Sequence, residues 1–362
     1  MSMPKRHHYV PLFRFRRFTA GSTGKRDSVW RLDVKSGRPD KVNPVNEAVE
    51  KHLYRVTLSD GSYDLGDEKA LSMIEGEAAR IVAQLDTCGC VAPAPIDEEW
   101  LAMFVHSMHQ RTPLARSWHK FFDEHTATEW TRVLLSNPES SRKALIHAGL
   151  VATDEEAAEQ RVAMLFGLEN GEWAFASDSS RQTAWMFIAM EEKIKALLEC
   201  LTWVLVRAGG DDQFILSDTP LAIVRSAEGD PGMGVGFCSP GAQTTLPLGP
   251  QLALLLFPGE PAWMELDADG DLVSEINLRT YAQAQRAIYG PSQGAVQRVR
   301  GLAKRRRGLV GQFRPIAPVS WFLDLPAGAG PGQYEFEGFA PDRKPKPLRL
   351  FVDSASDQSE NS

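Results

Sequence analysis

Apolar side chains recur every three or four positions through much of the N-terminal part of the chain, which is the spacing of an amphipathic helix. This pattern predicts helices over 67–85 and about 97–111, with a break at Pro113 and a further helix after it. Shorter helical patterns occupy 138–178. The longest periodic segment is 181–208, which at 1.5 Å per residue predicts a core helix about 42 Å long.

The pattern becomes that of β-strands in the C-terminal part of the chain. Its apolar runs predict a small antiparallel sheet, and the Asp-Gly pair at 269–270 has the composition of a hairpin turn. Two helices are expected after it, one that Ser274 caps and that runs to about Tyr289, and one that opens at Pro291. Residues 29–34 alternate between apolar and polar like a half-buried strand. The runs that predict the sheet are 213–216, 221–224, 252–257 and 263–266.

Runs of helices followed by a local sheet indicate an α+β fold, a mostly helical body with a small antiparallel sheet in the C-terminal half. We expect a single α+β domain over 1–340. It consists of a basic, partly extended N-terminal arm (1–66), a helical body (67–208), and a small sheet with basic helices (209–340). Residues 341–362 are polar and predict a disordered tail.

Composition changes this picture little. The 362 residues are 43% hydrophobic and 24% charged, which is ordinary for a soluble globular protein. No apolar stretch approaches the roughly 18 to 20 residues that cross a bilayer, and the basic start lacks the apolar core of a secretory signal. Four cysteines give no disulfide framework. We therefore expect a cytoplasmic protein without membrane association, and its oligomeric state stays open.

The net charge of -7 hides two basic segments that contain no acidic residue, 1–26 and 276–323. If the fold brings them together, their positive field suits nucleic acid or another polyanion. The alternative is that they are basic surfaces that pair with the acidic middle of the chain. The candidate ligand-binding residues are Arg14, Arg279, Arg286, Lys304, Arg305, Arg306 and Arg307.

The sequence Lys-Arg-His-His-Tyr-Val-Pro-Leu-Phe at 5–13 resembles the opening His-His-Tyr-Val-Pro signature of the domain of unknown function 4238 family. The chain departs from the family's pattern just afterwards, where Arg-Phe-Arg at 14–16 replaces a more neutral stretch. The resemblance spans roughly 5–290. It implies no mechanism, because the family has no established activity. Three later blocks fit it in order: 74–75, 110–113, and Trp203 followed by 214–220.

His7 and His8 are adjacent, so in extended backbone they point to opposite sides and cannot face one ligand together. Basic neighbours would lower the pKa of either imidazole and favour its neutral form, which acts as a base or a metal ligand. The alternative is a histidine that is hydrogen-bonded to the backbone.

His106 and His109 are three residues apart on a predicted helix, a spacing that can present two imidazoles to one divalent metal. Glu75 on the preceding helix is the natural third ligand. We expect His109 to lie nearer the apolar stripe and His106 nearer solvent. Packing between helices is the more common role for such a pair.

Arg111 ends its helix at a fixed break, where it could bind a carboxylate or phosphate with two hydrogen bonds. It could equally pair with Glu75 or Glu77 and join two helices. Asp218 follows an apolar strand, where acids, bases and metal ligands often lie, but Asp-Thr-Pro also favours an Asx-turn. The sequence contains no phosphate-binding, nucleophile-elbow or zinc-protease motif, and its Cys-x-Cys pair at 88–90 makes a poor zinc site.

Three hypotheses follow. The first is a metal-assisted, nuclease-like hydrolase of phosphodiesters, in which His7 or His8 shares one cleft with Glu75, Arg111 and Asp218. The second is a nucleic-acid-binding or regulatory protein without catalysis, in which the basic segments act alone. The third is an interaction module, in which the same residues only hold helices together.

Overall fold

The computed structural model gives the arrangement of most of the chain. Several expectations fall outside it, namely the disordered tail, the cysteines at 88 and 90, and most of the predicted helix before Met190. The structure describes residues 6–19, 27–51, 53–54, 56–57, 63–64, 66–87, 93–176, 187, 190–225 and 236–313.

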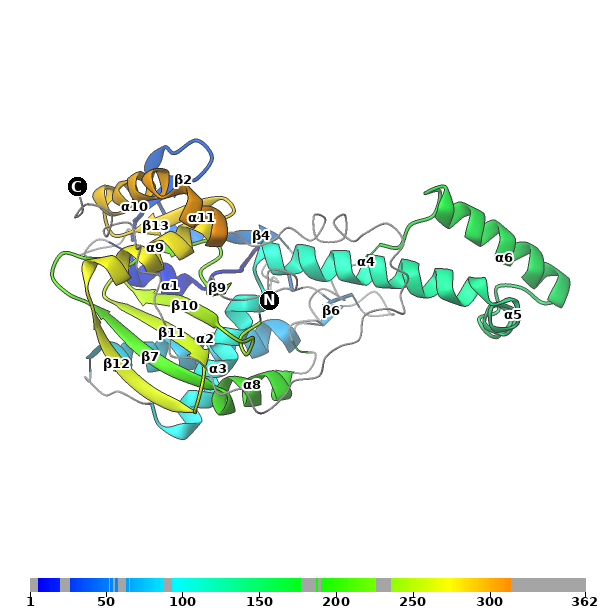
Figure 1. The fold of residues 1–362 in the computed structure, drawn as a ribbon, viewed down its shortest axis with the longest axis horizontal. Coiled ribbons are helices and arrows are strands. Elements are labelled where there is room, and N and C mark those ends of the chain that lie inside the picture. The colour runs from blue at the N-terminus through cyan, green and yellow to red at the C-terminus, as the bar shows by residue number, and fades with distance from the viewer. Residues whose placement is uncertain are drawn as a thin grey trace, which may run out of the picture.

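Helices are more numerous before residue 200 than after it (Figure 1). Two of the breaks between them follow from proline, which cannot donate a backbone hydrogen bond and is favoured in a first helical turn. Pro95 opens the third helix, and Pro113 opens the fourth behind the cap residue Thr112. The helices are α1 (Leu12–Arg17), α2 (Gly66–Thr87), α3 (Pro95–Gln110), α4 (Pro113–Ser136), α5 (Pro138–His147), α6 (Asp154–Glu169), α8 (Met190–Glu199), α9 (Gly270–Gln283), α10 (Gln293–Arg305) and α11 (Arg307–Phe313), with the 3-10 turn η1 (Pro44–Asn46).

The strands form more sheet than the sequence predicts. A five-stranded sheet has the order β12-β7-β11-β10-β9, and a four-stranded sheet has the order β3-β2-β13-β8. Two-stranded pairs join β1 with β4 and β5 with β6. The strands are β1 (Arg6–His8), β2 (Val29–Asp33), β3 (Pro39–Val42), β4 (Val49–Lys51), β5 (Val56–Thr57), β6 (Tyr63–Asp64), β7 (Leu201–Ala208), β8 (Leu216–Ser217), β9 (Ala222–Arg225), β10 (Ala242–Gly249), β11 (Leu252–Pro258), β12 (Ala262–Ala268) and β13 (Ala287–Gly290). The fold is therefore mixed α/β, and the expectation of one small sheet is too narrow.

The predicted helix over 181–208 is wrong in its last eight residues, which form β7. Alternate residues of this strand face two different cores. Trp203 and Leu205 pack with α2, α3 and α8, whereas Val204 and Val206 pack with α9. A strand that is covered on both faces is apolar at nearly every position, and such a run cannot be told from a buried helix by periodicity.

Three features of the C-terminal part also differ from the sequence prediction: the direction of one strand, the role of Asp269 and the end of one helix. The strand β12 runs parallel to β7, so the sheet is not purely antiparallel. Asp269 does not begin a hairpin; its side chain caps α9 by accepting a hydrogen bond of 2.8 Å from the Leu272 amide. The helix that was expected to reach Tyr289 ends at Gln283, and β13 follows it.

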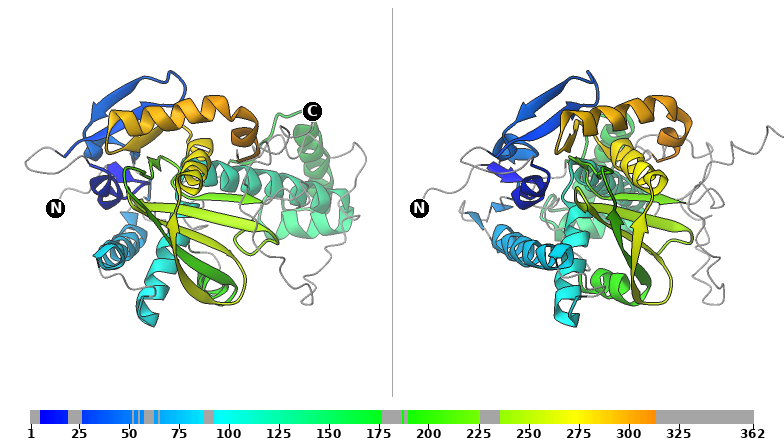
Figure 2. Two further views of the ribbon diagram at one scale, coloured as in Figure 1. Left: turned by 60° about the vertical axis from the view of Figure 1, so that its left-hand side comes forward. Right: turned by 90° about the vertical axis from the view of Figure 1, so that its left-hand side faces the viewer.

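The four-stranded sheet lies between α10 on one face and α1 with β1 on the other (Figure 2). Leu32 and Ile288 contact Val296 and Val299 of α10, while Tyr289 points to the opposite core. This arrangement places the predicted basic N-terminal arm and the basic C-terminal helices on the same sheet. No described helix is long and apolar enough to cross a membrane.

Candidate functional site

A group of polar side chains joins the N-terminal strand to the helical layer, and we call His8, Tyr54, Glu75 and Arg111 the signature cluster. Arg111 lies at its centre and is only 1% exposed. Its Nε donates to the Tyr54 hydroxyl at 2.9 Å, its Nη1 to Glu75 Oε1 at 2.7 Å, and its Nη2 to the His8 carbonyl oxygen at 2.5 Å. One guanidinium therefore connects β1, α2 and the end of α3.

The surroundings of Arg111 keep it charged. Burial alone would lower the pKa of Arg111, but the nearby Tyr54 and Glu75 outweigh that effect and raise it. The Tyr54 ring also lies below the guanidinium, with 5.4 Å between Cζ and the ring centroid. Glu75 keeps 27% of its side chain exposed. Of the two sequence interpretations of Arg111, the observed geometry matches the pair with Glu75 that joins two helices.

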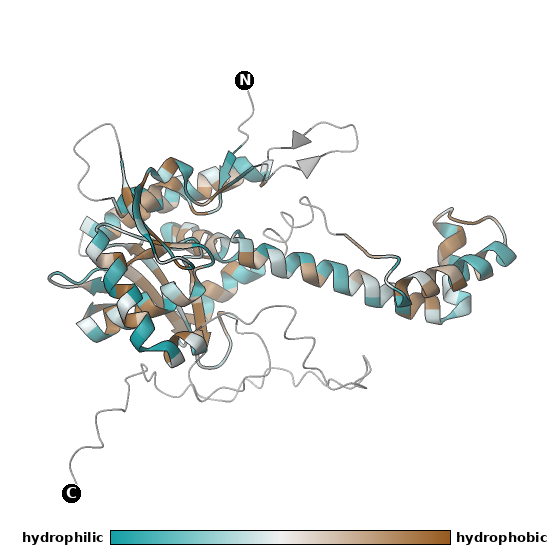
Figure 3. Cartoon of the chain, turned by 90° about the horizontal axis from the view of Figure 1, so that it is seen from above, coloured by the Kyte–Doolittle hydropathy of each residue, from teal (hydrophilic) through white to brown (hydrophobic). Residues whose placement is uncertain are grey.

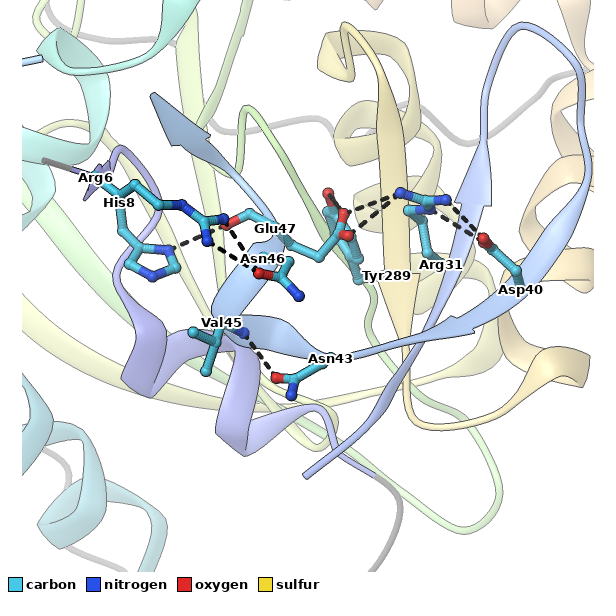
Figure 4. A network of polar contacts seen from close by, with 9 residues as sticks. All are labelled: Arg6, His8, Arg31, Asp40, Asn43, Val45, Asn46, Glu47 and Tyr289. Carbon is cyan, nitrogen blue, oxygen red and sulfur yellow. Dashed lines mark hydrogen bonds and ion pairs between the residues drawn. The ribbon is translucent and has the colours of Figure 1, made fainter. Parts of the chain in front are cut away.

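His8 is held as a neutral base. Its Nδ1 lies 3.0 Å from the Glu47 carbonyl oxygen, which can only accept, so the hydrogen must be on Nδ1 and the lone pair on Nε2 (Figure 4). Burial lowers the pKa of His8, and Arg111 adds to this effect, against the opposing influence of Glu47 and Glu75. The neutral tautomer can accept a proton or bind a metal through Nε2.

Glu47 extends this contact into the four-stranded sheet, and sequence reasoning missed it. Its carboxylate, which is almost buried, accepts a hydrogen bond from the Tyr289 hydroxyl at 3.0 Å and another from Arg31 Nη1 at 3.2 Å. Arg31 also binds Asp40 on the neighbouring strand at 2.6 Å (Figure 4). The network therefore runs from His8 to the β2–β3 hairpin. No motif surrounds Glu47 in the sequence, and no local signal could have identified it.

His7 has different partners from His8, as extended backbone requires. Its Nδ1 accepts the Leu53 amide hydrogen at 3.0 Å, and its Nε2 lies 3.4 Å from Glu68 Oε2. The ring is 6% exposed and packs beside Tyr54. These contacts hold the signature segment against residues 53–54 and the start of α2.

Asp218 does not join the signature cluster through any hydrogen bond or ion pair among the described residues. Its two carboxylate oxygens accept the amide hydrogens of Gln285 and Arg286 at 3.0 and 2.8 Å. Burial raises the pKa of Asp218 to about 6, although these amides lower it. Asp218 thus fastens the turn after β8 to the segment between α9 and β13, which differs from an Asx-turn within its own loop.

Glu75, the expected third ligand of His106 and His109, is paired with Arg111. The expectation that His106 lies nearer solvent is wrong, because it is 1% exposed. His109 contacts the Gln110 amide at 3.0 Å and the edge of Phe237, and burial, followed by neighbouring positive charge, lowers its pKa to about 3. Within the described residues, the structure contains no group of three or more His, Cys, Asp or Glu side chains that could hold a metal ion.

Two of the candidate ligand-binding arginines lie in the interior. Arg14 donates to the Pro247 carbonyl oxygen and lies 5.7 Å from the Phe104 ring centroid. Burial, with the nearby charge of Arg17, lowers the pKa of Arg14 to about 9. Arg279 binds Glu275 on its own helix and Gln243 on β10. Neither side chain reaches the surface.

The other candidates lie at the surface, where α10 packs beside the β2–β3 hairpin (Figure 2). Arg300 Nη1 donates to the Gly37 carbonyl oxygen at 3.0 Å, and the Arg286 carbonyl accepts the Val34 amide hydrogen at 3.0 Å. Arg306 is half-buried. We call the exposed cationic residues of this region the basic face: Lys35, Arg38, Lys41, Arg286, Arg298, Lys304, Arg305 and Arg307. Not one of them forms an ion pair with a described acid.

These features define a mixed α/β protein with a buried, arginine-centred polar cluster and a separate cationic surface. Residues 6–294 match the family described as protein of unknown function DUF4238, and the chain belongs to that family. The comparisons with curated proteins and with solved structures returned no match. The function must therefore be argued from the geometry of the two regions.

Proposed function

We propose that this protein binds nucleic acid through its phosphate backbone, at the basic face. The observation that carries this proposal is the contact between the β2–β3 hairpin and α10, two elements with exposed basic residues that are far apart in the sequence. The N-terminal segment 1–26 does not contribute to it, because its helix α1 packs on the opposite face of the four-stranded sheet. Arg300 holds the hairpin turn at Gly37 against α10, and the exposed lysines and arginines around this junction have no described acidic partner. Unpaired arginine and lysine side chains are the groups that neutralise phosphates.

The hairpin also contains two acidic side chains, Asp33 and Asp40, and both have local partners. Asp33 accepts hydrogen bonds from the amide and hydroxyl of Ser36, which lower the pKa of its carboxyl group. Asp40 pairs with Arg31 on the opposite side of the hairpin from α10. Contacts to phosphate carry little sequence information, so we expect binding with weak sequence preference.

The test is fluorescence polarisation with a labelled 20-base-pair duplex at several salt concentrations. Replacing Lys304, Arg305 and Arg307 together by alanine should weaken binding at least tenfold. It should also reduce the slope of log affinity against log salt by about 0.9 per lost phosphate contact. The matched control replaces Arg132, Arg142 and Lys143 together by alanine. This variant loses the same three positive charges, but from α4 and α5. Equal affinities and slopes for the two triple variants would contradict the proposal.

A second candidate, metal-assisted hydrolysis of phosphodiesters at the signature cluster, is favoured by the state of His8. A neutral imidazole whose tautomer is fixed by a carbonyl can act as a base or bind a divalent cation through Nε2. Glu75 lies close enough to influence the pKa of His8, and its carboxylate is partly exposed. In this reading Arg111 positions Glu75 and the His8 backbone.

Cleavage of a plasmid or of bis-p-nitrophenyl phosphate, in the presence of Mg²⁺ or Mn²⁺, tests this second candidate. Turnover that is lost in His8→Ala but kept in His147→Ala, an exposed histidine on α5, would support it. Absence of turnover with either metal, in a protein that still binds the duplex, would leave nucleic-acid binding as the function.

A further inference from the structure

The helices α4, α5 and α6 form an arm that extends away from the two sheets (Figure 1). Its long member, α4, contains 24 residues, and α5 and α6 pack against one another and against its far end. Arg161 of α6 fastens this end by donating to the Leu135 carbonyl oxygen at 2.7 Å. The arm therefore presents its tip at a distance from both the signature cluster and the basic face.

Large apolar side chains are unusually exposed on this arm. Figure 3 shows hydrophobic residues along the helices at its far end. Trp130 is 70% exposed and Val162 is 60% exposed. Single exposed apolar residues are ordinary on a protein surface, but a concentration of them on one projection marks an interaction surface. The exposed apolar residues of the arm are Phe122, Trp130, Val133, Leu134, Leu150, Val162, Phe166, Trp173 and Phe175.

The outer face of α6 contains a shallow groove of about 600 Å³, whose lining is mostly apolar. Ala158, Val162 and Phe166 follow one another at intervals of four residues, so they lie in a row along the helix. Ala163 widens the row with a second small side chain. Rows of side chains four residues apart are the ridges that pack into the grooves of another helix.

The chain turns back after α6 and packs an aromatic side chain, Trp173, against the end of this helix. Gly171 has a φ of 70°, a left-handed conformation that suits glycine, and the Trp173 amide donates to the Gly167 carbonyl oxygen at 3.1 Å. The Trp173 ring then lies so close to Gly167 that a Cβ atom there would be 2.8 Å from the indole. Trp173 nevertheless remains 43% exposed.

The charge around the groove is negative. The basic residue of α6, Arg161, is engaged with α4, and the exposed charged residues of α6 and the turn after it are all acidic. Asp154 is paired with Arg142 of α5, and Glu156 accepts the Ala152 and Thr153 amide hydrogens. The remaining acidic residues are Glu159, which lines the groove, and Glu155, Glu169 and Glu172. Pairing this face with the same face of a second copy would bring like charges together, which disfavours a symmetric dimer here.

We propose that the α6 groove binds a cationic amphipathic helix of a partner protein. The row from Ala158 to Phe166 receives the apolar side of that helix, and the acidic rim binds its lysines and arginines. This proposal is independent of nucleic-acid binding, because it uses a different part of the chain with the opposite charge. Together the two surfaces would let one molecule hold a polyanion and a basic protein segment.

The experiment uses the full chain and a labelled 18-residue helical peptide made of leucine and lysine, with binding followed by fluorescence anisotropy. We expect saturable binding that Phe166→Ser weakens at least tenfold. The matched control is Leu150→Ser, which removes an equally exposed apolar side chain of the same arm outside the groove. Because both side chains are exposed, neither change should prevent folding.

Three results would overturn the proposal. The first is equal weakening, or no weakening, by Phe166→Ser and Leu150→Ser. The second is equal binding of a leucine and glutamate peptide of the same length, which would remove the role of the acidic rim. The third is a dimer in sedimentation velocity that Phe166→Ser dissociates, which would assign the groove to a second copy of the chain.

Discussion

The signature cluster and the basic face use the same side chain in opposite ways. Arg111 is almost fully buried and donates to three different partners, whereas Arg298 and Arg305 are exposed and have no described acid beside them. A buried guanidinium must be compensated, because an unpaired buried charge costs several kcal/mol. An exposed guanidinium is solvated and stays free to bind phosphate. Burial thus separates arginines that fix the fold from arginines that can bind a ligand.

The basic residues of the two acid-free segments also fall into a buried group and an exposed group. Arg14 and Arg279 come from those segments, yet they lie in the interior and bind the protein's own carbonyl, amide and carboxylate groups. Lys304 and Arg305 come from the same C-terminal segment as Arg279 and lie at the surface. Counting charges along a sequence therefore overestimates the number of cationic side chains that a polyanion can reach.

The largest effect that this comparison predicts is on Arg111. Replacing it by alanine should lower the free energy of unfolding by about 3 to 5 kcal/mol, because Glu75, the Tyr54 hydroxyl and the His8 carbonyl all lose a buried partner. Urea denaturation would measure the change. The control Arg298→Ala should stay within about 0.5 kcal/mol of the parent protein. Similar losses in the two variants would break the distinction between the regions.

The partly buried His109 extends the comparison to a group whose charge can change. The pKa of His109 lies at about 3 in the folded protein, below the ordinary value of 6.5. The unfolded chain therefore binds a proton first as pH falls, so the stability from this residue is complete above pH 6.5 and is lost below it. The slope is at most about 1.4 kcal/mol per pH unit.

Unfolding free energies measured between pH 7 and pH 4 test this point. His109→Gln should flatten the fall in stability with acidification. Identical slopes in the parent protein and in His109→Gln would show that His109 is not held neutral by its surroundings.

A smaller effect tests the geometry of the basic face without altering its charge. Gly37 has a φ of 69°, and a Cβ atom there would lie 1.8 Å from Arg300 Cζ. Gly37→Ala should therefore destabilise the protein by about 1 to 2 kcal/mol and displace Arg300 from the hairpin. Duplex binding should weaken several-fold.

Gly294→Ala is the matched control for that change, because the nearest atom to a Cβ at Gly294 is 3.9 Å away and the residue lies in α10. Alanine there should leave binding unchanged and slightly stabilise the helix. If both variants lose duplex binding, or if neither does, then binding does not depend on the contact between Arg300 and Gly37.

Much of the helical layer could be predicted from the sequence, because amphipathic helices keep one face polar. In the predicted helix over 67–85, the apolar residues Leu71, Ile74 and Ala78 follow the helical spacing and are buried, and α3 ends where Arg111 and Pro113 indicate. The strand β7 could not be predicted in this way, since cores on both of its faces remove the alternation that identifies a strand. The predicted hairpin turn at Asp269 and Gly270 is wrong for a different reason. An Asp-Gly pair suits both a turn and the start of a helix, and here Asp269 caps α9.

The signature cluster was predictable only in part. The helix break makes Arg111 a strong candidate, and Glu75 lies on the adjoining helix, so their pair follows from local rules. Tyr54 and Glu47 come from a segment for which the sequence predicts no helix or strand, and Tyr289 comes from the end of a predicted helix that is a strand instead. Only the tertiary fold connects Tyr54 and Glu47 to His8, and Tyr289 to Glu47. Asp218 could not be placed, because its partners are backbone amides 67 and 68 residues away.

The most direct test of the central claim is lysine footprinting with an acetylating reagent in the presence and absence of duplex DNA. The account predicts that the duplex protects Lys35, Lys41 and Lys304, which belong to the basic face. Lys120 and Lys143, which lie on the arm, should react equally in both conditions. Protection of the arm lysines, or of no lysine under conditions where the duplex is bound, would contradict the assignment of nucleic-acid binding to the basic face.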